Sequence, residues 1–305
     1  MLNRRILRIK VFKVLYSFAE NPAETLKEAE GLLDHSCESA RDLYLFMLSI
    51  AGPLTDEAAS RIEAARSKFN PTEEESHPNL KFVQNRIKPL LEQDPDFSKI
   101  ISRKKLSWEQ YDVLLRHLYE TIRTREYFQK YLSSGEGSLK EDAKLFCDIF
   151  ANEFEDNTEL EEILEDMSIL WNDDLAYILN ICCKTFEDLG KGKTWNLPDL
   201  YLSDSDSRKD RESDKAFIYK VLRTAYKNFD KYYQDIAAIT PKWDKNRICA
   251  TDLSLIVCGL AEAEAFPDMP TRIIINEYVE ISKFYSTPES RGFVNGILDR
   301  LINKK

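Results

Sequence analysis

The chain has 305 residues, of which 43% are apolar and 11% aromatic, so it is long enough to bury one large core or two smaller ones. It contains only nine glycines, and the glycine-rich phosphate-binding patterns of nucleotide-binding proteins are absent from it. The formal net charge of −10 argues against a uniformly basic nucleic-acid-binding protein. These features exclude proteins built on phosphate loops or on many tight turns, and they favour long helices.

The cysteines and the hydropathy of the chain bear on its cellular compartment. Six cysteines are scattered along the sequence with no C-x-x-C pair and no histidine at metal-ligand spacing, as in a reduced cytosolic protein. No run approaches eighteen apolar residues, and Arg8, Lys10 and Lys13 interrupt what could otherwise be the core of a signal peptide. We therefore expect a soluble cytoplasmic protein that holds no metal or other cofactor and does not enter a membrane.

Residues 1–20 are predicted to form a basic amphipathic helix. Its apolar face consists of residues spaced three or four apart: Leu7, Val11, Val14, Leu15 and Phe18. Its charged residues are Arg4, Arg5, Arg8, Lys10 and Lys13, against Glu20 alone. Positive charge at a helix N-terminus is unfavourable for the helix dipole, so these arginines call for an anion, for which RNA phosphate is the natural candidate. The alternative is an ordinary solvated helix start.

Residues 21–213 are predicted to form further helices separated by polar, turn-rich breaks. The helical runs are approximately 23–35, 39–69, 80–93, 107–132, 139–154, 159–171 and 174–189. The breaks are at 70–78, 133–138 and 203–214, and we expect the last to be a flexible linker. Residues 141–174 carry thirteen acidic residues and a single basic one, Lys144, so their local charge of −12 exceeds the net charge of −10 and the rest of the chain is slightly positive; we interpret this stretch as a solvated helical face.

Residues 214–301 are predicted to form four more helices. The third begins near Pro270 and carries an apolar stripe at Ile274, Tyr278, Ile281 and Tyr285. After the joint Ser286-Thr287-Pro288-Glu289, the fourth begins, and its apolar residues share one side. Gly292 and Gly296 lie four apart on it and cost helix propensity, so we expect another backbone to pack closely against them.

The C-terminal motifs resemble those of the NusB family of transcription antitermination factors. Three matching segments stand in the family's order and spacing: Pro270, Ile275-Asn276-Glu277-Tyr278-Val279-Glu280, and Phe293-Val294-Asn295-Gly296-Ile297-Leu298-Asp299. A preceding W-x-x-x-R-I-x-x-x-D-x-x-I run is matched by Trp243, Arg247, Ile248, Asp252 and Ile256, and the first helix has the family's arginines followed by Leu15-Tyr16. Two departures are Cys258, in place of an arginine, and Arg291-Gly292, in place of the frequent His-Lys.

The resemblance implies an all-α fold, a NusB-like antiparallel helical bundle with an additional inserted helical region. Residues 1–20 would supply the first helix and basic arm, residues 214–303 the remainder of the bundle, and residues 21–213 the insert. The family crosses the inserted interval in a few tens of residues, so the insert sets this chain apart.

The resemblance also implies a function. The protein would bind the single-stranded boxA element of nascent ribosomal RNA together with the ribosomal protein NusE, within the transcription elongation complex, and would prevent termination. The implied RNA contacts are Arg4, Arg5, Arg8, Lys10, Arg291 and Asn295, and the implied partner contacts are Asp252 and Tyr16. Within the sequence itself, Asp252 could equally form a local pair with Arg247 or Lys245.

Catalysis is not expected. The histidines His35, His77 and His117 lie in the insert without a partner at the spacing of a triad or a metal site, and no nucleotide-binding βαβ pattern is present. The alternative to RNA binding is a helical scaffold for protein–protein interaction in which the insert has displaced the RNA.

Overall fold

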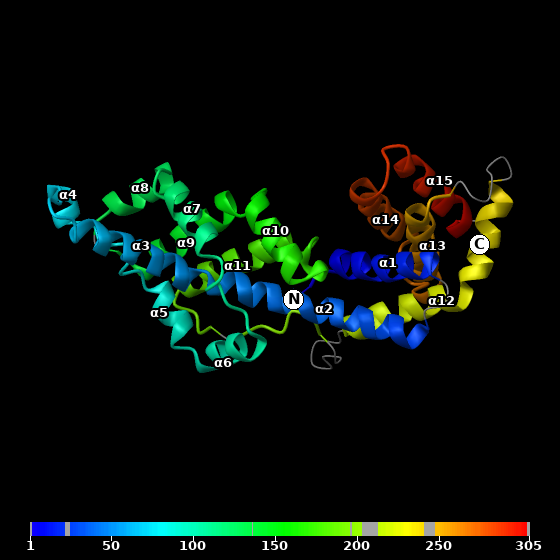
Figure 1. Ribbon diagram of the computed structural model, residues 1–305. Coiled ribbons are helices and arrows are strands. Elements are labelled where there is room, and N and C mark those ends of the chain that lie inside the picture. Colours follow the sequence, from blue (N-terminus) through cyan, green and yellow to red (C-terminus); the bar gives the residue numbers. More distant parts are fainter. Residues whose placement is uncertain are drawn as a thin grey trace. The chain divides into compact units, whose positions relative to one another are not determined.

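The computed structural model describes residues 2–21, 25–135, 137–195, 197–202, 213–240 and 248–303. All the regular elements in these ranges are helices, which confirms the all-α prediction (Figure 1). By its internal packing the chain divides into two compact units: unit 1 comprises Met1–Glu38 and Asp199–Lys305, and unit 2 comprises Ser39–Pro198. Within the described ranges, none of the helices combines the length and the apolar character that a membrane span requires.

The boundaries of these units differ from the division 1–20, 21–213 and 214–303 predicted from the sequence. The first boundary falls within α2 (Leu26–Ser49), because the first turns of this helix pack in unit 1. There Asp34 accepts hydrogen bonds from Tyr201 at 2.7 Å, from Lys215 at 2.6 Å and from Tyr219 at 2.6 Å. The linker expected at 203–214 lies outside the described residues except for Ser213, which caps the following helix, and Asp214.

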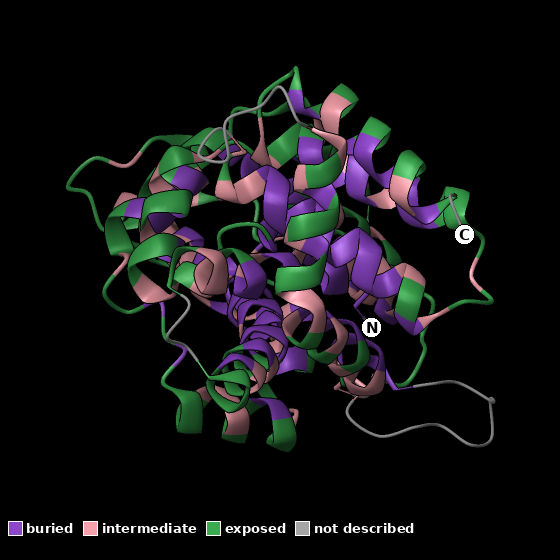
Figure 2. Ribbon diagram, turned by 90° about the vertical axis from the view of Figure 1, so that its right-hand side faces the viewer, coloured by how far each residue is buried: buried purple, intermediate pink, exposed green. Residues whose placement is uncertain are grey.

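Unit 1 is organised around a single buried helix. Besides the first turns of α2, this unit contains α1 (Arg4–Glu20), α12 (Asp214–Ile239), α14 (Thr271–Tyr285) and α15 (Ser290–Ile302), and these four helices all contact α13 (Ala250–Ala265). Every residue of α13 from Asp252 to Glu262 is buried, and Figure 2 colours the buried residues of the chain purple. A helix that is apolar on all sides is stable only when other elements surround it.

The close helix contact in unit 1 occurs at Gly259 of α13. A Cβ atom at this position would lie 2.7 Å from Cδ2 of Leu298 and 3.3 Å from Cδ2 of Tyr278, so the absence of a side chain admits both α14 and α15. A Cβ at Gly292 or Gly296 would meet nothing within 4 Å. The expectation of a backbone packed against these two glycines is therefore wrong, because they lie on the exposed face of α15.

Unit 2 contains the second part of α2 and a series of shorter helices. These are α3 (Ala51–Arg66), α4 (Glu73–Ser76), α5 (Ile87–Glu92), α6 (Pro95–Lys104), α7 (Asp112–Ile122), α8 (Glu126–Ser133), α9 (Leu139–Glu153), α10 (Thr158–Met167), the 3-10 helix η1 (Ile169–Trp171) and α11 (Leu175–Gly190). The pair α9 and α11 forms the core, in which the Phe186 ring lies 5.4 Å from that of Phe146 and 5.0 Å from that of Phe150. The two long helices expected at 39–69 and 107–132 are each divided into two.

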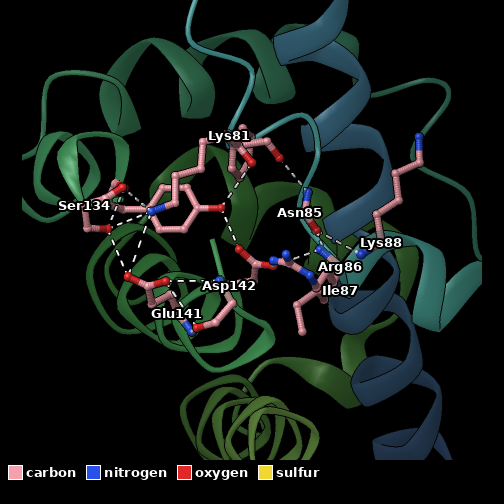
Figure 3. Close-up of polar contacts among 11 residues, drawn as sticks. Lys81, Asn85, Arg86, Ile87, Lys88, Ser134, Glu141 and Asp142 are labelled. Carbon is pink, nitrogen blue, oxygen red and sulfur yellow. Dashed lines mark hydrogen bonds and ion pairs between the residues drawn. The ribbon is translucent and has the colours of Figure 1, made fainter. Parts of the chain in front are cut away.

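The acidic residues 141–174 are only partly a solvated face. The Asp142 side chain is buried at the start of α9, where it accepts hydrogen bonds from the Arg86 amide at 3.0 Å and from the Tyr131 hydroxyl at 2.7 Å (Figure 3). Glu153 is buried at the end of the same helix and binds Arg125. These carboxylates tie the surrounding loops to the core because a buried carboxylate must be paired or hydrogen-bonded.

Candidate nucleic-acid interface

The helix α1 brings its arginines to the acidic side chains of α13 and α14. Its N-terminus is capped by Asn3, whose Oδ1 accepts a hydrogen bond from the Ile6 amide at 2.9 Å. The first turn contains no acidic residue, so the cationic start of this helix requires compensation from elsewhere in the chain. Unit 1 supplies carboxylates for this purpose from sequence positions more than 250 residues away.

Arg8 forms a buried ion pair with Glu262. The Arg8 side chain is 5% exposed and that of Glu262 is 0% exposed, and the two are joined by Nη2–Oε1 at 2.6 Å and Nε–Oε2 at 2.9 Å. The hydroxyl of Tyr278 donates a further hydrogen bond to Glu262 at 2.8 Å. Burial works to lower the Arg8 pKa, but its hydrogen bonds and the charge of Glu262 outweigh this effect and raise the pKa. Arg8 is therefore a structural cation of the core.

Arg5 is the exposed member of the same charged cluster. Its side chain is 46% exposed, and it binds Glu277 through two hydrogen bonds of 2.9 Å and 2.8 Å. Glu277 also lies 3.5 Å from Nη1 of Arg8, so one carboxylate bridges both arginines. The hydrogen bonds from Arg5 lower the pKa of Glu277, and its partial burial opposes them.

The other predicted arm residues are engaged within unit 1. The Arg4 guanidinium lies 4.2 Å from the centre of the Phe217 ring, in cation–π geometry. Lys10 is buried, and its Nζ donates a hydrogen bond to Ser36 Oγ at 3.2 Å. Of the four predicted arm contacts, Arg5 is thus the residue whose side chain the structure exposes most clearly.

The predicted RNA contacts on α15 are accessible. Arg291 and Asn295 are both exposed, on the same open face as the two glycines. A hydrogen bond from Lys283 lowers the pKa of Glu280, and the positive charges of Arg5 and Arg291 lower it further. Since these three cations act on the same carboxylate, Arg5 of α1, Lys283 of α14 and Arg291 of α15 lie near one another on unit 1.

The two predicted partner contacts lie in different environments. Tyr16 is 41% exposed on α1. Asp252 is only 6% exposed, and its carboxylate accepts hydrogen bonds from Ser286 at 2.5 Å and from Ser290 at 2.7 Å. Its buried position corrects the expectation of a surface acid, since Asp252 holds the joint between α14 and α15 in place. Arg247 and Lys245, the local partners considered for it, lie outside the described residues.

The carboxylates that organise the cluster were missed in the sequence. Glu262 carried a usable signal, because it follows the largely apolar run 253–261, and a carboxylate buried there requires a cation or hydrogen-bond donors. Nothing in the local sequence indicated that its cation would be Arg8. Among the residues that the structure describes, no group of three or more potential metal ligands occurs.

Comparison with known proteins identifies relatives of the C-terminal part of the chain. Residues 180–303, from within α11 to the end of α15, match the model of the NusB family. The chain is similar to the transcription antitermination proteins NusB of Chloroherpeton thalassium, at 38% identity over 90 residues, and of Natranaerobius thermophilus, at 35% over 88 residues. It is also 34% identical over 94 residues to the protein of the same name from Alkaliphilus oremlandii.

The extent of these similarities is limited. The three alignments cover 30%, 29% and 31% of this chain, and they span 43%, 63% and 68% of the respective relatives. No solved structure showed significant similarity. The match to 68% of a relative at 34% identity, together with the family model over α12 to α15, shows that the chain belongs to the NusB family.

Proposed function

We propose that this protein is a cytoplasmic, RNA-binding transcription antitermination factor. Its RNA would be the boxA-like single-stranded element of nascent ribosomal RNA, bound together with the ribosomal protein NusE in the elongation complex. The relatives bear the name transcription antitermination protein, which supports the role. The observation that carries the proposal is the group of exposed cations Arg5, Lys283 and Arg291, which come from three helices and lie near one another on unit 1.

Arg5 and Arg291 would contact phosphate groups, and Asn295 would supply a neutral hydrogen-bonding group beside them. A guanidinium that is fixed by one carboxylate still has donors to offer, and Arg5 uses only its Nε and Nη2 atoms for Glu277. The open glycines beside Asn295 leave room for a nucleic-acid backbone to approach α15. Arg8 and Lys10 would act indirectly, by holding α1 in position.

The test is the salt dependence of binding to a labelled boxA RNA. Each phosphate contact that is lost should reduce the slope of log affinity against log salt by about one unit. Arg5→Ala and Arg291→Ala should each weaken binding and flatten this slope. Arg116→Ala is the matched control, because Arg116 is an exposed arginine of unit 2 that is paired with Asp112. The proposed interface would be contradicted if all three variants changed RNA affinity equally, or if none of them changed it.

Tyr16 is our candidate contact for NusE. An aromatic side chain that is partly exposed on a rigid helix is a common anchor at protein interfaces. In a calorimetric titration with NusE, Tyr16→Ala should weaken binding, whereas Val113→Ala, at another exposed apolar side chain, should not. Asp252 is unsuitable for this test, because replacing it breaks two hydrogen bonds at the joint between α14 and α15.

A scaffold for protein–protein interaction is the second candidate function. It is favoured by the burial of Arg8 and Lys10, which leaves the arm less cationic on its surface than the sequence predicted. We do not propose catalysis under either function. A protein that binds NusE but shows no salt-dependent affinity for boxA RNA would establish the scaffold in place of the RNA-binding function.

A further inference from the structure

Two cysteines face each other across the helix pair at the core of unit 2. Cys147 lies on α9 and Cys183 on α11. The Cys147 Sγ atom lies 3.3 Å from the carbonyl oxygen of Cys183, and the Cys183 Sγ atom lies 3.8 Å from the carbonyl oxygen of Cys147. This reciprocal arrangement places each sulfur against the backbone of the opposite cysteine.

The backbones of α9 and α11 are close enough for their side chains to be joined. Towards one end of the pair, a Cβ atom at Gly190 would lie 2.8 Å from Cβ of Ala143 and 3.3 Å from Cα of Lys140. A disulfide requires Cα atoms within about 7 Å of each other and sulfurs directed at one another. Each of the two sulfurs lies within 4 Å of the other cysteine's carbonyl oxygen, so both side chains project into the contact between α9 and α11, within reach of one another.

The pair is also accessible, unlike most of the other cysteines. Cys147 and Cys183 are partly exposed, whereas Cys37, Cys182 and Cys258 are buried. The neighbouring Cys182 points elsewhere, with its Sγ atom 3.9 Å from the carbonyl oxygen of Tyr44. The expectation that all the cysteines are inert core residues therefore does not extend to this pair.

We propose that Cys147 and Cys183 are a modification site, a peroxide-reactive thiol pair that closes to an intramolecular disulfide between α9 and α11. The structure contains both thiols in the reduced form, and the oxidant is a hydroperoxide, for which hydrogen peroxide is the probe.

The environment distinguishes the two sulfurs. The hydrogen bond from Cys147 lowers the pKa of Cys183, although burial and the nearby carboxylates Glu187 and Asp148 oppose this effect. The same hydrogen bond, together with burial, raises the pKa of Cys147. Since the thiolate is the nucleophile, Cys183 is the peroxide-attacking sulfur and Cys147 the resolving one.

The reaction has two steps. In the first, the Cys183 thiolate attacks one oxygen of hydrogen peroxide, so that an S–O bond forms, the O–O bond breaks and hydroxide leaves to be protonated to water. In the second, the Cys147 sulfur loses its proton and attacks the Cys183 sulfur; an S–S bond forms, the S–O bond breaks and a second water leaves. The two sulfurs together give up two electrons, which reduce one peroxide to two waters.

The test uses the full-length, reduced protein treated with hydrogen peroxide after removal of the reductant. Wild type should lose two of its six free thiols and two hydrogen masses, and peptide mapping should join the α9 and α11 fragments. Cys147→Ser should stop at a sulfenic acid on Cys183, which a dimedone adduct detects. Cys183→Ser should slow oxidation by roughly tenfold or more, because the activated thiolate is absent. Cys249→Ser is the control and should behave as wild type, since Cys249 is exposed but lies outside the pair.

Several results would overturn the proposal. One is the retention of both thiols in wild type while Cys249 is oxidised. Another is an unchanged rate in Cys183→Ser, confirmed as folded by its circular dichroism. Should either serine variant fail to fold, alkylation of wild type by iodoacetamide decides the matter, because Cys183 must then react faster than Cys147 near neutral pH.

Discussion

Arg8 and Glu262 neutralise each other where water reaches neither side chain. Replacing Arg8 with Ala should lower the free energy of unfolding of unit 1 by about 3–5 kcal/mol, because the Glu262 charge would be left buried without its partner. Arg5→Ala should cost at most about 1 kcal/mol, because the Arg5 side chain is 46% exposed and Glu277 keeps Arg8 as a nearby cation. Urea denaturation would measure both variants. Similar losses for the two would show that Arg8 is not a residue of the core.

Glu277 should make the protein sensitive to acid. Because hydrogen bonds from Arg5 lower its pKa in the folded state, the folded protein binds this proton less readily than the unfolded chain. The stabilisation is present above the ordinary glutamate pKa and is lost as the pH falls through the lowered value. Glu277→Gln should therefore be less stable than wild type at neutral pH and should lose less stability on acidification.

A pH series of thermal melts would measure this effect. Glu162→Gln, at an exposed glutamate of α10 in unit 2, is the control for the removal of one surface charge. The prediction fails if Glu277→Gln and wild type lose stability in parallel below the ordinary carboxyl range.

The sequence revealed the cations of the candidate site but not their surroundings. An arginine-rich helix start predicts a nearby anion. In the structure, the carboxylates of Glu262 and Glu277 bind Arg8 and Arg5 within the chain itself. Local spacing cannot reveal such a pair, because the two partners lie more than 250 residues apart. The same limit applies to Asp252, whose serine partners lie across a helix joint.

At the scale of the helix, glycine has opposite effects on α13 and α15. Gly259→Ala should destabilise unit 1 by about 1–3 kcal/mol, because the new methyl group would force Leu298 out of its packed position. Gly292→Ala and Gly296→Ala should each stabilise by up to about 1 kcal/mol, since alanine favours the helix and nothing obstructs the added methyl. Thermal melts would distinguish these outcomes. Destabilisation by Gly292→Ala or Gly296→Ala would mean that another part of the protein packs against this face of α15.

The periodic pattern of apolar residues predicted the presence of helices better than it predicted where each helix begins and ends. The predicted helices at 139–154 and 174–189 correspond closely to α9 and α11, because both have strong apolar periodicity between polar breaks. The run 107–132 was predicted as one helix, but it is interrupted at Arg123 to Arg125. There, the side chains of Thr124 and Gln129 donate hydrogen bonds to backbone carbonyls. Such local bonds compete with the helix, and the spacing of apolar residues does not reveal them.

At the scale of the whole molecule, each unit has its own apolar core. Calorimetry should therefore resolve two unfolding transitions. Phe150→Ala should destabilise unit 2, and Leu298→Ala should destabilise unit 1, each by about 2–5 kcal/mol, because both side chains are fully buried. Each substitution should lower the temperature of one transition and leave the other in place. A single transition that moves in both variants would show that the two units unfold as one.

The ion pair between Arg8 and Glu262 also determines how late during synthesis the packing of α1 can be completed. The two residues are separated by 254 positions, so a ribosome that adds about 5–20 residues per second needs roughly 10–50 s to deliver the second after the first. For most of that interval the apolar face of α1 has none of α12 to α15 to cover it, because α12 begins only at Asp214, while the whole of unit 2 emerges and can fold. Nascent α1 is thus a segment that a chaperone would need to shield until translation is nearly complete.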